Sequence, residues 1–316
     1  MASRQEARVA EFVKPFRVKP GSKVTLGKHF DPASTEGVEG KKQAKQTLVG
    51  GIPQLAEYQS RLYAQDTHGV LVVLQAMDAG GKDGTIRHVM SGVNPQGVNV
   101  HSFKVPSSDE LDHDYLWRYA LQLPARGQIA IFNRSHYEEV LVVRVHQALL
   151  KRQKLPRNAR GAGIWKRRYR EINDWERYLN DNGIKVVKLF LNLSKEEQRI
   201  RFLRRIDLPD HNWKFSTADV RERQYWDDYQ KAFSEMLSNT STEWAPWHVI
   251  PADQKWYARL AAGAVIVQAL MEINPRYPTV TRETRDALLE VKRELEAQAP
   301  DGAAADPFQE TEPPAV

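Results

Sequence analysis

The sequence predicts an α/β fold in which helices cover both faces of one parallel sheet. Along most of the 316-residue chain, short apolar runs alternate with segments of helical character, and this alternation is typical of parallel strands joined by helices. A glycine-rich turn follows the first long apolar run, as expected where a strand leads directly into a helix. Because 41% of the residues are hydrophobic, the chain can bury a full-sized core, as one large domain or as one domain with appendages.

The N-terminal part is expected to contribute an arm, two helices and two strands. Residues 1–50 are rich in Lys, Gly and Pro and show little periodicity, so they predict a basic arm that wraps the domain. Residues 52–66 predict a helix, and the apolar run 70–76 predicts the first strand. A second helix is expected over 82–90, and the alternating segment 98–105 predicts the second strand.

The middle of the chain predicts three helices and one strand. A helix is expected to begin at Ser108 and to run to 121. The short apolar run 128–135 ends in polar groups, as expected of a buried parallel strand whose C-terminal edge faces a ligand. Further helices are predicted over 137–150 and over 164–182, where Gly183 stops the second one.

The C-terminal part completes the alternation. Residues 186–193 predict a strand, and the capping box 194–197 begins the next helix. An arginine-rich helical hairpin is expected around 206–216, followed by a strand at 247–251 and a core helix at 253–273. The expected domain division is therefore 1–50 for the arm, 51–275 for the α/β domain, and 276–316 for a charged helix with a disordered acidic tail.

A phosphate-binding loop is the most informative motif. The run 70–85 places a glycine-rich turn and a lysine after an apolar strand, at the spacing of such loops. There, backbone N–H groups face an anion, and the lysine supplies a mobile charge. An ordinary strand-to-helix turn would need only the two glycines, but the complete strand, turn and helix favour phosphate binding. The predicted phosphate-binding residues are Gly80, Gly81, Lys82, Asp83, Gly84 and Thr85.

The loop departs from the usual pattern and carries an additional acid. Ala76 stands where the first glycine belongs. Asp83 stands where Ser or Thr normally ligates magnesium, so its carboxylate is expected to bind the metal directly or to act as a base. Asp78 lies inside the loop, where it would repel phosphate unless a metal intervenes or a proton is shared. Asp78 and Lys82 are thus catalytic candidates, Asp78 as metal ligand or acceptor-orienting base, with a turn-capping role for Asp78 as the alternative.

A second group of polar residues follows the strand that is expected to neighbour the loop. Asn133, Arg134 and Ser135 end this strand, where an arginine can reach a transferring phosphate bidentately. Arg134 is therefore the third catalytic candidate. Pairing with a structural carboxylate, such as Glu138 or Glu139, is the alternative for this arginine.

The arginines of the hairpin cannot all face one site, because helical spacing separates them. Arg204 and Arg221 flank the hairpin loop most closely and are the predicted phosphate contacts. Helix surface charge is the alternative for each of them.

Charge and composition restrict the partners of the chain. The formal net charge is +6, and the segment from Glu294 onward is acidic, so the body is more basic than the total and its partner is expected to be an anion. The chain has no cysteine, which excludes disulfides and thiolate metal sites and suits a cytoplasmic protein. No segment is expected to approach the ~20 apolar residues of a membrane span, so no membrane partner is predicted.

Aromatic and histidine residues give no sign of a second chemistry. The histidines show no pairing at metal-ligand spacing, so a zinc site is not expected. The tryptophans are predicted to be core and interface anchors rather than base-stacking platforms; they include Trp213, Trp226, Trp244, Trp247 and Trp256.

Four segments together resemble the second family of polyphosphate kinases. They are Ala76 to Thr85, Phe132 to Glu138, the stretch from Trp213 onward, and Ile250 to Arg259. The likeness follows the family's motif order over roughly residues 20–275. It implies a P-loop kinase fold related to thymidylate kinase: a three-layer sandwich with a central five-stranded parallel sheet and a helical lid at about 200–225.

The resemblance also implies an activity. Members of this family transfer a phosphoryl group from inorganic polyphosphate to a nucleotide with Mg²⁺, for which Mn²⁺ is an alternative ion. The excess of Lys and Arg would then form a basic channel for the polyanion. The sequence from Asn133 to Glu138 resembles that of the subgroup that accepts both nucleoside mono- and diphosphates. Such an enzyme would make ATP from AMP in two steps. Guanine nucleotides are expected as further acceptors, and the reverse reaction is expected as well. A homo-oligomer, dimer or tetramer, is expected.

By the same resemblance, Asp78 corresponds to the essential loop aspartate, Lys82 to the loop lysine and Arg134 to the arginine of the second motif. Asn133, Arg134 and Glu138 are the implied nucleotide-binding residues. Many members carry Asp where this chain has Asn133. A neutral amide binds magnesium more weakly than a carboxylate, so Asn133 is not expected to be a metal ligand.

Two other functions are compatible with the motifs. An ATP-dependent nucleotide kinase would use the same loop. A basic nucleic-acid-binding protein would stack bases on its tryptophans, but aromatic and basic residues are not interleaved along one strand as that function requires. No nucleic-acid partner is therefore predicted.

Overall fold

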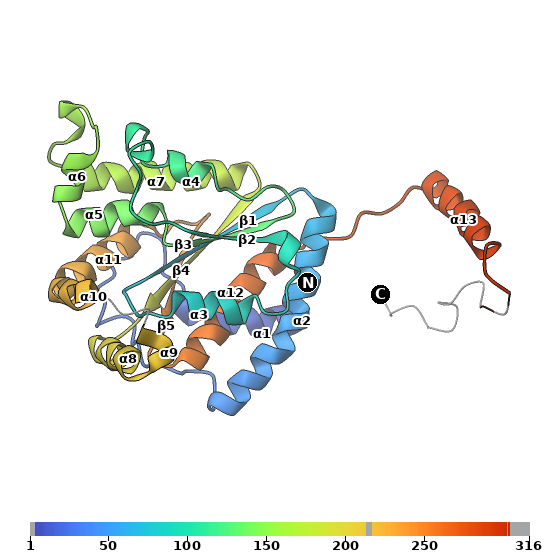
Figure 1. Ribbon diagram of the computed structural model, residues 1–316, viewed down its shortest axis with the longest axis horizontal. Helices are drawn as coiled ribbons and strands as arrows, with labels where there is room; N and C mark the ends of the chain where they lie inside the picture. The colour runs from blue at the N-terminus through green and yellow to red at the C-terminus, as the bar shows by residue number, and fades with distance from the viewer. Residues whose placement is uncertain (1–3, 213–216, 302, 304–316) are drawn as a thin grey trace. The chain divides into compact units, whose positions relative to one another are not determined.

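In the computed structural model, which describes residues 4–212, 217–301 and 303, the described part contains one sheet of five parallel strands in the order β2-β3-β1-β4-β5 (Figure 1). This arrangement confirms the predicted α/β class and the five-stranded parallel sheet. The two neighbours of the central strand come from distant parts of the chain, so the loop after it lies beside other strand ends. The strands are β1 (Gly69–Ala76), β2 (Val98–Ser102), β3 (Ile129–Asn133), β4 (Ile184–Asn192) and β5 (Trp247–Pro251).

The central strands are buried on both faces, which is why they appear in the sequence as continuous apolar runs. In β1, Val70, Val72 and Leu74 face one hydrophobic core, and Leu71 and Val73 face the other. All five side chains are almost inaccessible to solvent. Burial of each such side chain contributes about 1.5–3 kcal/mol, so each face of the sheet requires a helical cover.

Four helices cover the first core: α1 (Arg4–Val13), α2 (Lys41–Gln65), α3 (Lys82–Val89) and α12 (Lys255–Ile273) (Figure 1). By length and composition α12 could cross a membrane, so the expectation that no segment approaches such a span is wrong. Most of α12 is buried inside the protein, which accounts for its apolar character as a core helix.

The second core lies against the opposite face of the sheet. It is covered by α7 (Ile164–Asp181) and α11 (Trp226–Thr240), with the 3₁₀ helix η4 (His136–Val140) beside them. Trp226 and Trp247 are buried in this core, as predicted for anchoring tryptophans.

Local capping signals place two helix ends where the sequence predicts them. Gly183, which follows the C-cap residue Asn182 of α7, has a positive φ of 79°, a conformation that glycine adopts without strain. The Ser194 hydroxyl accepts a hydrogen bond from the Glu197 N–H at 3.1 Å and caps α8 (Lys195–Asp207). The predicted capping box is therefore formed on its serine side.

The N-terminal region differs from the prediction. Residues predicted to belong to the arm form α1, whose Val13 reaches the core, and α2 begins at Lys41 instead of residue 52. Pro53 lies inside α2, although proline in a helix interior costs roughly 3 kcal/mol. Before the proline, Ala44 is buried and Leu48 lies against Gly263 of α12. These tertiary contacts, with the burial of Leu55 and Leu62 after the proline, outweigh the local preference and set the early start of α2.

Two predicted helices are broken in the structure. The segment 108–121 forms only the short η3 (Glu110–Asp112) and α4 (Trp117–Ala120), and 137–150 divides into η4, α5 (Val142–Val145) and α6 (Ala148–Arg152). In the second case, His136, Tyr137 and Glu139 are buried polar side chains with fixed partners. Their contacts hold the backbone away from a continuous helix.

The arginine-rich hairpin continues from α8 into further short helices. Trp213 and Ser216, which belong to the predicted lid, lie outside the described residues. The remaining short elements of this unit are η1 (Lys14–Phe16), η2 (Pro95–Gly97), η5 (Arg157–Ala159), α9 (Pro209–Asn212), α10 (Thr217–Glu222) and η6 (Arg223–Tyr225).

A second unit comprises residues 277–316. Its one described helix is α13 (Arg282–Glu296), whose first turn is capped by the Thr281 hydroxyl. This agrees with the charged helix predicted beyond residue 281. The acidic tail that was predicted to be disordered lies mostly outside the described residues.

His248 on β5 makes the stability of the fold sensitive to acid. Burial lowers the pKa of its imidazole to about 4, and the positive charges of Arg17, Lys185 and Lys188 act in the same direction. In the unfolded chain the same group has a pKa near 6.5. The unfolded state therefore takes up the proton first, and stability is lost as the pH falls from about 6.5 towards 4.

The substitution His248→Leu removes this titration. Between pH 7 and pH 4, the free energy of unfolding of the unsubstituted protein should fall by about 3 kcal/mol more than that of this variant. Urea titration at each pH measures both values. An identical pH dependence in the two proteins would contradict the assignment to His248.

Candidate active site

The loop between β1 and α3 makes a tight turn that depends on Gly80 and Gly81. Ala79 and Gly81 have positive φ values of 60° and 98°. A Cβ atom on Gly80 would lie 2.6 Å from the Ala76 Cβ and 2.8 Å from the Met77 carbonyl oxygen, distances that real side chains do not tolerate. The close packing at Gly80 and the left-handed turn at Gly81 thus bring the chain round to the N-terminus of α3.

Lys82 is the first residue of α3 and folds back across the loop. Its ammonium group donates a hydrogen bond to the Ala76 carbonyl oxygen at 3.1 Å. Burial lowers the pKa of this ammonium, while the nearby Asp78 carboxylate raises it. The ammonium charge of Lys82 is therefore held at the N-terminus of α3, where free backbone N–H groups can also bind an anion.

Arg201 of α8 fixes the loop from the other side. Its guanidinium donates to the carbonyl oxygens of Ala79 and Gly80 at 3.0 and 3.1 Å, and further bonds reach Ala252 and Asp253. Gln198, one turn earlier, donates to the Asp78 carbonyl oxygen at 2.9 Å. With its carbonyl oxygens held in this way, the loop can direct its N–H groups towards a ligand.

The sequence prediction did not select Arg201 from the arginines of the hairpin. A usable signal was present, because Gln198, Arg201 and Phe202 follow the i, i+3, i+4 spacing of one helix face. All three are buried in α8. A helix face that mixes an aromatic residue with polar ones indicates that the polar groups have partners inside the protein.

The end of β3 meets the loop directly, because β3 pairs with β1 and Leu74 lies opposite Asn133. The Arg134 guanidinium lies 3.3 Å from an Asp78 carboxylate oxygen. The Asn133 amide donates to the Asp83 carboxylate at 2.7 Å. Arg134 therefore pairs with Asp78, and not with Glu139, whose carboxylate binds Arg168 at 2.8 Å.

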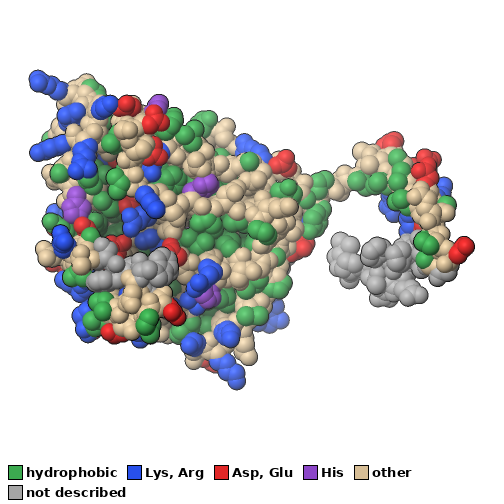
Figure 2. All heavy atoms as spheres, in the orientation of Figure 1, with side chains coloured by type: hydrophobic (Ala, Val, Ile, Leu, Met, Phe, Trp, Pro, Cys, Tyr) green, Lys and Arg blue, Asp and Glu red, His purple; other side chains and the backbone are tan. Residues whose placement is uncertain are grey.

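A cavity of about 720 Å³ opens above the loop. All the predicted loop residues line it, together with Asn133 and Arg134, and Figure 2 shows Lys and Arg side chains gathered over α3 and beside it. Arg204 lines the cavity, whereas Arg221 is not among its lining residues. The cationic lining consists of Lys82, Arg87, Lys104, Arg134, Arg201, Arg204, Arg205, Lys255 and Arg259, against the acids Asp78, Asp83 and Asp219.

The crowding of these cations affects their protonation. Burial lowers the pKa of Lys255, and the neighbouring Arg201 and Arg204 lower it further. Burial also lowers the pKa of Arg259, with Arg87 and Arg201 acting in the same direction. Mutual repulsion of this kind is relieved when a polyanion binds, so the cavity is suited to a chain of negative charges.

A smaller cavity of about 150 Å³ adjoins the first and shares Asp78 and Arg134 with it. Its lining adds the acids Glu138 and Glu222 and the hydroxyl group of Tyr229. Burial raises the pKa of Glu138, whereas the charges of Arg134 and Lys82 lower it. The predicted nucleotide-binding residue Glu138 thus lies in this second cavity rather than in the first.

No cluster of three or more His, Cys, Asp or Glu side chains able to hold a metal ion occurs among the described residues. The loop does offer the carboxylates of Asp78 and Asp83 beside the first cavity. One or two carboxylates completed by substrate phosphates and water are the ordinary donor set of Mg²⁺ in phosphoryl-transfer sites. The residues present therefore fit this ion.

A parallel sheet, a phosphate-binding loop with its lysine and a cation-lined cavity at the carboxyl ends of the strands define a P-loop phosphotransferase. Residues 39–278 match the family model described as Polyphosphate kinase 2 (PPK2). The chain belongs to this family, as the sequence motifs imply. It is a phosphotransferase of this type, dependent on polyphosphate and acting on a nucleotide.

Similar proteins extend over nearly the whole chain. It is 49% identical over 286 residues to an ADP-polyphosphate phosphotransferase of Rhodopseudomonas palustris, a match that covers 89% of this chain and 98% of that protein. It is 47% identical over 267 residues to an AMP/ADP-polyphosphate phosphotransferase of Meiothermus ruber, covering 84% and 96%. The crystal structure of polyphosphate kinase 2 from Arthrobacter aurescens TC1 superposes with a TM-score of 0.75 at 39% identity, covering 87% and 98%.

The substitution Gly80→Ala tests the packing of the loop. The added methyl group collides with Ala76 and with the Met77 carbonyl oxygen, so the loop must move and phosphotransfer should fall at least about 100-fold, equivalent to about 2.7 kcal/mol. Gly50→Ala is the control, because no atom lies within 4 Å of its Cβ position, and alanine in a helix interior should raise stability by up to about 1 kcal/mol. Normal turnover by the Gly80 variant would contradict the packing argument.

The substitution Arg201→Met tests the bracing of the loop. Four carbonyl oxygens lose their donor, so the free energy of unfolding should fall by about 2–4 kcal/mol. Turnover should also fall, even at temperatures where the variant is still folded. Arg199→Met on the same helix removes only an exposed pair with Glu196 and should change neither quantity. Equal stability of the two variants in chemical denaturation would refute the bracing role.

Proposed function

We propose that this enzyme transfers the terminal phosphoryl group of inorganic polyphosphate to AMP and to ADP, with guanine nucleotides as further acceptors, and that it also catalyses the reverse reaction. The observation that carries the proposal is that two cavities of different character meet at Asp78 and Arg134. The larger one is lined by cations and suits the polyanionic donor. The relatives named as ADP- and AMP/ADP-polyphosphate phosphotransferases support the choice of acceptors.

In this proposal the donor chain lies along the larger cavity, with its terminal unit over the loop. The N–H groups from Gly81 to Gly84 and the Lys82 ammonium bind that unit. The N–H groups of Gly80 and Thr85, which the sequence predicts as further phosphate contacts, already donate to the carbonyl oxygens of Met77 at 3.0 Å and Gly81 at 2.9 Å. Arg204 contacts units further along the chain, and Arg221 of α10 remains a predicted phosphate contact outside the observed lining. Holding the donor in this way supplies the positioning on which phosphoryl transfer mainly depends.

The acceptor phosphate is assigned to the boundary between the two cavities. Arg134 would stabilise the negative charge of the group in transfer through two parallel N–H donors. Asp78 would orient the acceptor oxygen or bind the metal ion, and Asn133 and Glu138 would contact the nucleotide. The pairing of Asp78 with Arg134 at 3.3 Å keeps these two groups side by side where the two cavities meet.

Mg²⁺, or Mn²⁺ in its place, is the proposed cofactor. Asp78 would hold it, with Asp83 near enough in the loop to assist. When bound, the ion neutralises charge on the phosphate oxygens. Asn133 donates its amide to Asp83, which orients the carboxylate rather than adding a third ligand.

Two parallel incubations test the proposed acceptors, with the nucleotides followed by chromatography. Purified protein with Mg²⁺ and polyphosphate, without ATP, should convert AMP to ADP first and to ATP later in one, and ADP to ATP in the other. Addition of excess EDTA should stop the reaction. Formation of ATP from ADP, with AMP left unchanged, would refute the mono- and diphosphate specificity while leaving the family assignment intact.

The substitutions Lys82→Ala and Arg134→Ala test the assigned roles. Each should lower kcat by at least about 100-fold, because each removes a cation at the site of charge development. Neither side chain belongs to the hydrophobic core, so thermal melting should change by only a few degrees. Lys41→Ala, an exposed residue of α2, is the control. Near-normal kcat for Lys82→Ala would place the site elsewhere, and a large loss of thermal stability for Arg134→Ala would indicate a structural role.

A further inference from the structure

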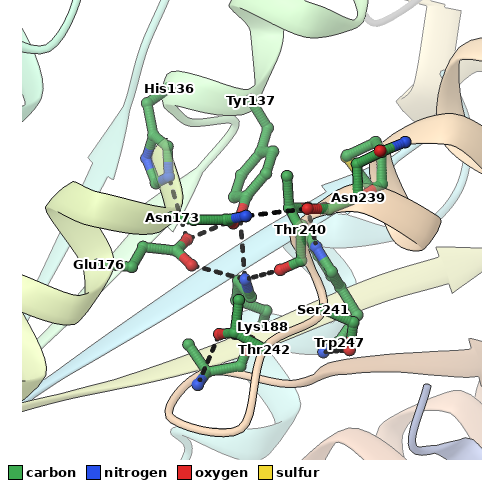
Figure 3. A network of polar contacts seen from close by, with 12 residues as sticks. His136, Tyr137, Asn173, Glu176, Lys188, Asn239, Thr240, Ser241, Thr242 and Trp247 are labelled. Carbon is green, nitrogen blue, oxygen red and sulfur yellow. Dashed lines mark hydrogen bonds and ion pairs between the residues drawn. The ribbon is translucent and has the colours of Figure 1, made fainter. Parts of the chain in front are cut away.

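A network of buried charges lies inside the second core, on the sheet face that α7 and α11 cover (Figure 3). At its centre is Lys188, in the middle of β4. Its ammonium donates to a Glu176 carboxylate oxygen at 2.6 Å, to the Tyr137 hydroxyl at 2.9 Å and to the Thr240 carbonyl oxygen at 2.6 Å. Each of its three protons therefore has an acceptor inside the protein.

Glu176 completes the network from α7. Its other carboxylate oxygen accepts from the Tyr137 hydroxyl at 2.7 Å and lies 3.3 Å from His136 Nε2. The side chains of Lys188, Glu176 and His136 are fully buried. Although burial raises the pKa of Glu176, the charge of Lys188 and the contact with His136 bring it below its usual value, and burial lowers the pKa of His136. An ionised pair with a neutral imidazole is the resulting state.

Stability alone does not explain this network. Removing two charges from water costs several kcal/mol each, and apolar residues of similar volume often replace a buried ion pair without loss. The cation-lined cavity does not include Lys188 or Glu176, so they do not bind substrate. What the pair does contact is Tyr137 and His136, two consecutive residues of η4.

The segment from Arg134 to Glu139 separates into side chains anchored in the core and side chains that line the cavities. Ser135 accepts a hydrogen bond from Gln75 of β1 at 3.0 Å, and Glu139 binds Arg168 of α7 at 2.8 Å. His136 and Tyr137 are anchored by the buried pair, as described above. Only Arg134 and Glu138 point into the cavities, and Arg134 does so with a positive φ of 66°, a conformation that non-glycine residues adopt at a cost of about 1 kcal/mol or more.

We propose that the Lys188–Glu176 pair is a positioning device for the phosphoryl-transfer site. By fixing the Tyr137 hydroxyl and the His136 ring from one direction, it sets the course of η4, and thereby the orientation of Arg134 and Glu138 towards Asp78. The inference rests on the role proposed above for Arg134. It predicts an effect on turnover rather than on donor binding, because neither Lys188 nor Glu176 contacts the phosphate-binding loop.

The test is an apolar replacement of the whole pair, Lys188→Met together with Glu176→Met. Lys188→Met alone would leave an uncompensated buried carboxylate, whereas the double substitution removes both charges and leaves only the neutral groups of Tyr137, His136 and Thr240 without these partners. The melting temperature should fall by several degrees, while in the folded protein kcat should fall at least tenfold and KM for polyphosphate should stay within twofold. An unchanged kcat in this folded variant would overturn the proposal.

Tyr137→Phe provides a second variant should the double substitution fail to fold. It removes only the hydroxyl group, and with it the bonds to Lys188 and Glu176, and leaves the ion pair in place. We expect kcat to fall several-fold, again with KM for polyphosphate unchanged. Full activity of a folded Tyr137→Phe protein would likewise overturn the proposal.

A matched control lies on the same strand. Lys185 of β4 pairs with Glu272 of α12 at 2.8 Å, and α12 covers the sheet face opposite to that of η4, so Lys185→Met with Glu272→Met should leave kcat unchanged. A tenfold fall in this control would show that any charge removal near β4 lowers activity, and would overturn the specific role of Lys188.

Combination with Arg134→Ala separates this inference from the proposed function. If the buried pair acts through Arg134 and Glu138, the Lys188/Glu176 double substitution should lower the residual kcat of a protein that carries both Arg134→Ala and Glu138→Gln less than twofold. A further tenfold fall would overturn the proposal. Normal activity of Arg134→Ala alone would instead refute the role of Arg134 in the proposed function, whatever the network does.

Discussion

The parallel pairing of β1 with β3 is the constraint on which the site depends. It places Leu74 opposite Asn133, so the residues that follow the two strands emerge side by side at one edge of the sheet. The phosphate-binding loop follows β1, and Arg134 follows β3. Groups that are 50 and 56 residues apart in the chain are thus brought within hydrogen-bond distance. A sheet with another strand order would separate the loop lysine from the arginine.

The cations of the site divide into two kinds according to what they already bind. The Arg201 guanidinium donates hydrogen bonds to backbone carbonyl oxygens of the loop and its surroundings, so its charge serves mainly to hold the chain in place. Lys255 and Arg259, one turn apart on α12, have pKa values that are lowered by burial and by neighbouring cations. The first kind shapes the loop, and the second provides the positive potential that attracts a polyanion. Sequence composition counts both kinds alike, which is why the net charge alone cannot identify the binding residues.

The sequence predicted those features that local chemistry determines. The five strands, the loop at Gly80 and Gly81, and the cap at Ser194 each depend on neighbouring residues, and the structure contains all of them. The early start of α2, the broken helix after Tyr137 and the burial of Arg201 depend on side chains that only the folded chain brings together. The proximity of Asn133 and Arg134 to the loop lies between these cases, because it follows from the sequence once the strand order is known.

Lys188 has a consequence for how the chain assembles. Its neighbours Val187 and Leu189 point to the first core, where the surroundings are apolar. A slip of β4 by one residue would turn the ammonium towards that apolar side and away from the Glu176, Tyr137 and Thr240 oxygens that accept its protons. The free-energy penalty for an unpaired buried charge is large. Lys188 therefore disfavours sheets in which β4 pairs with its neighbours in a shifted register, so a single side chain helps to select the native alignment.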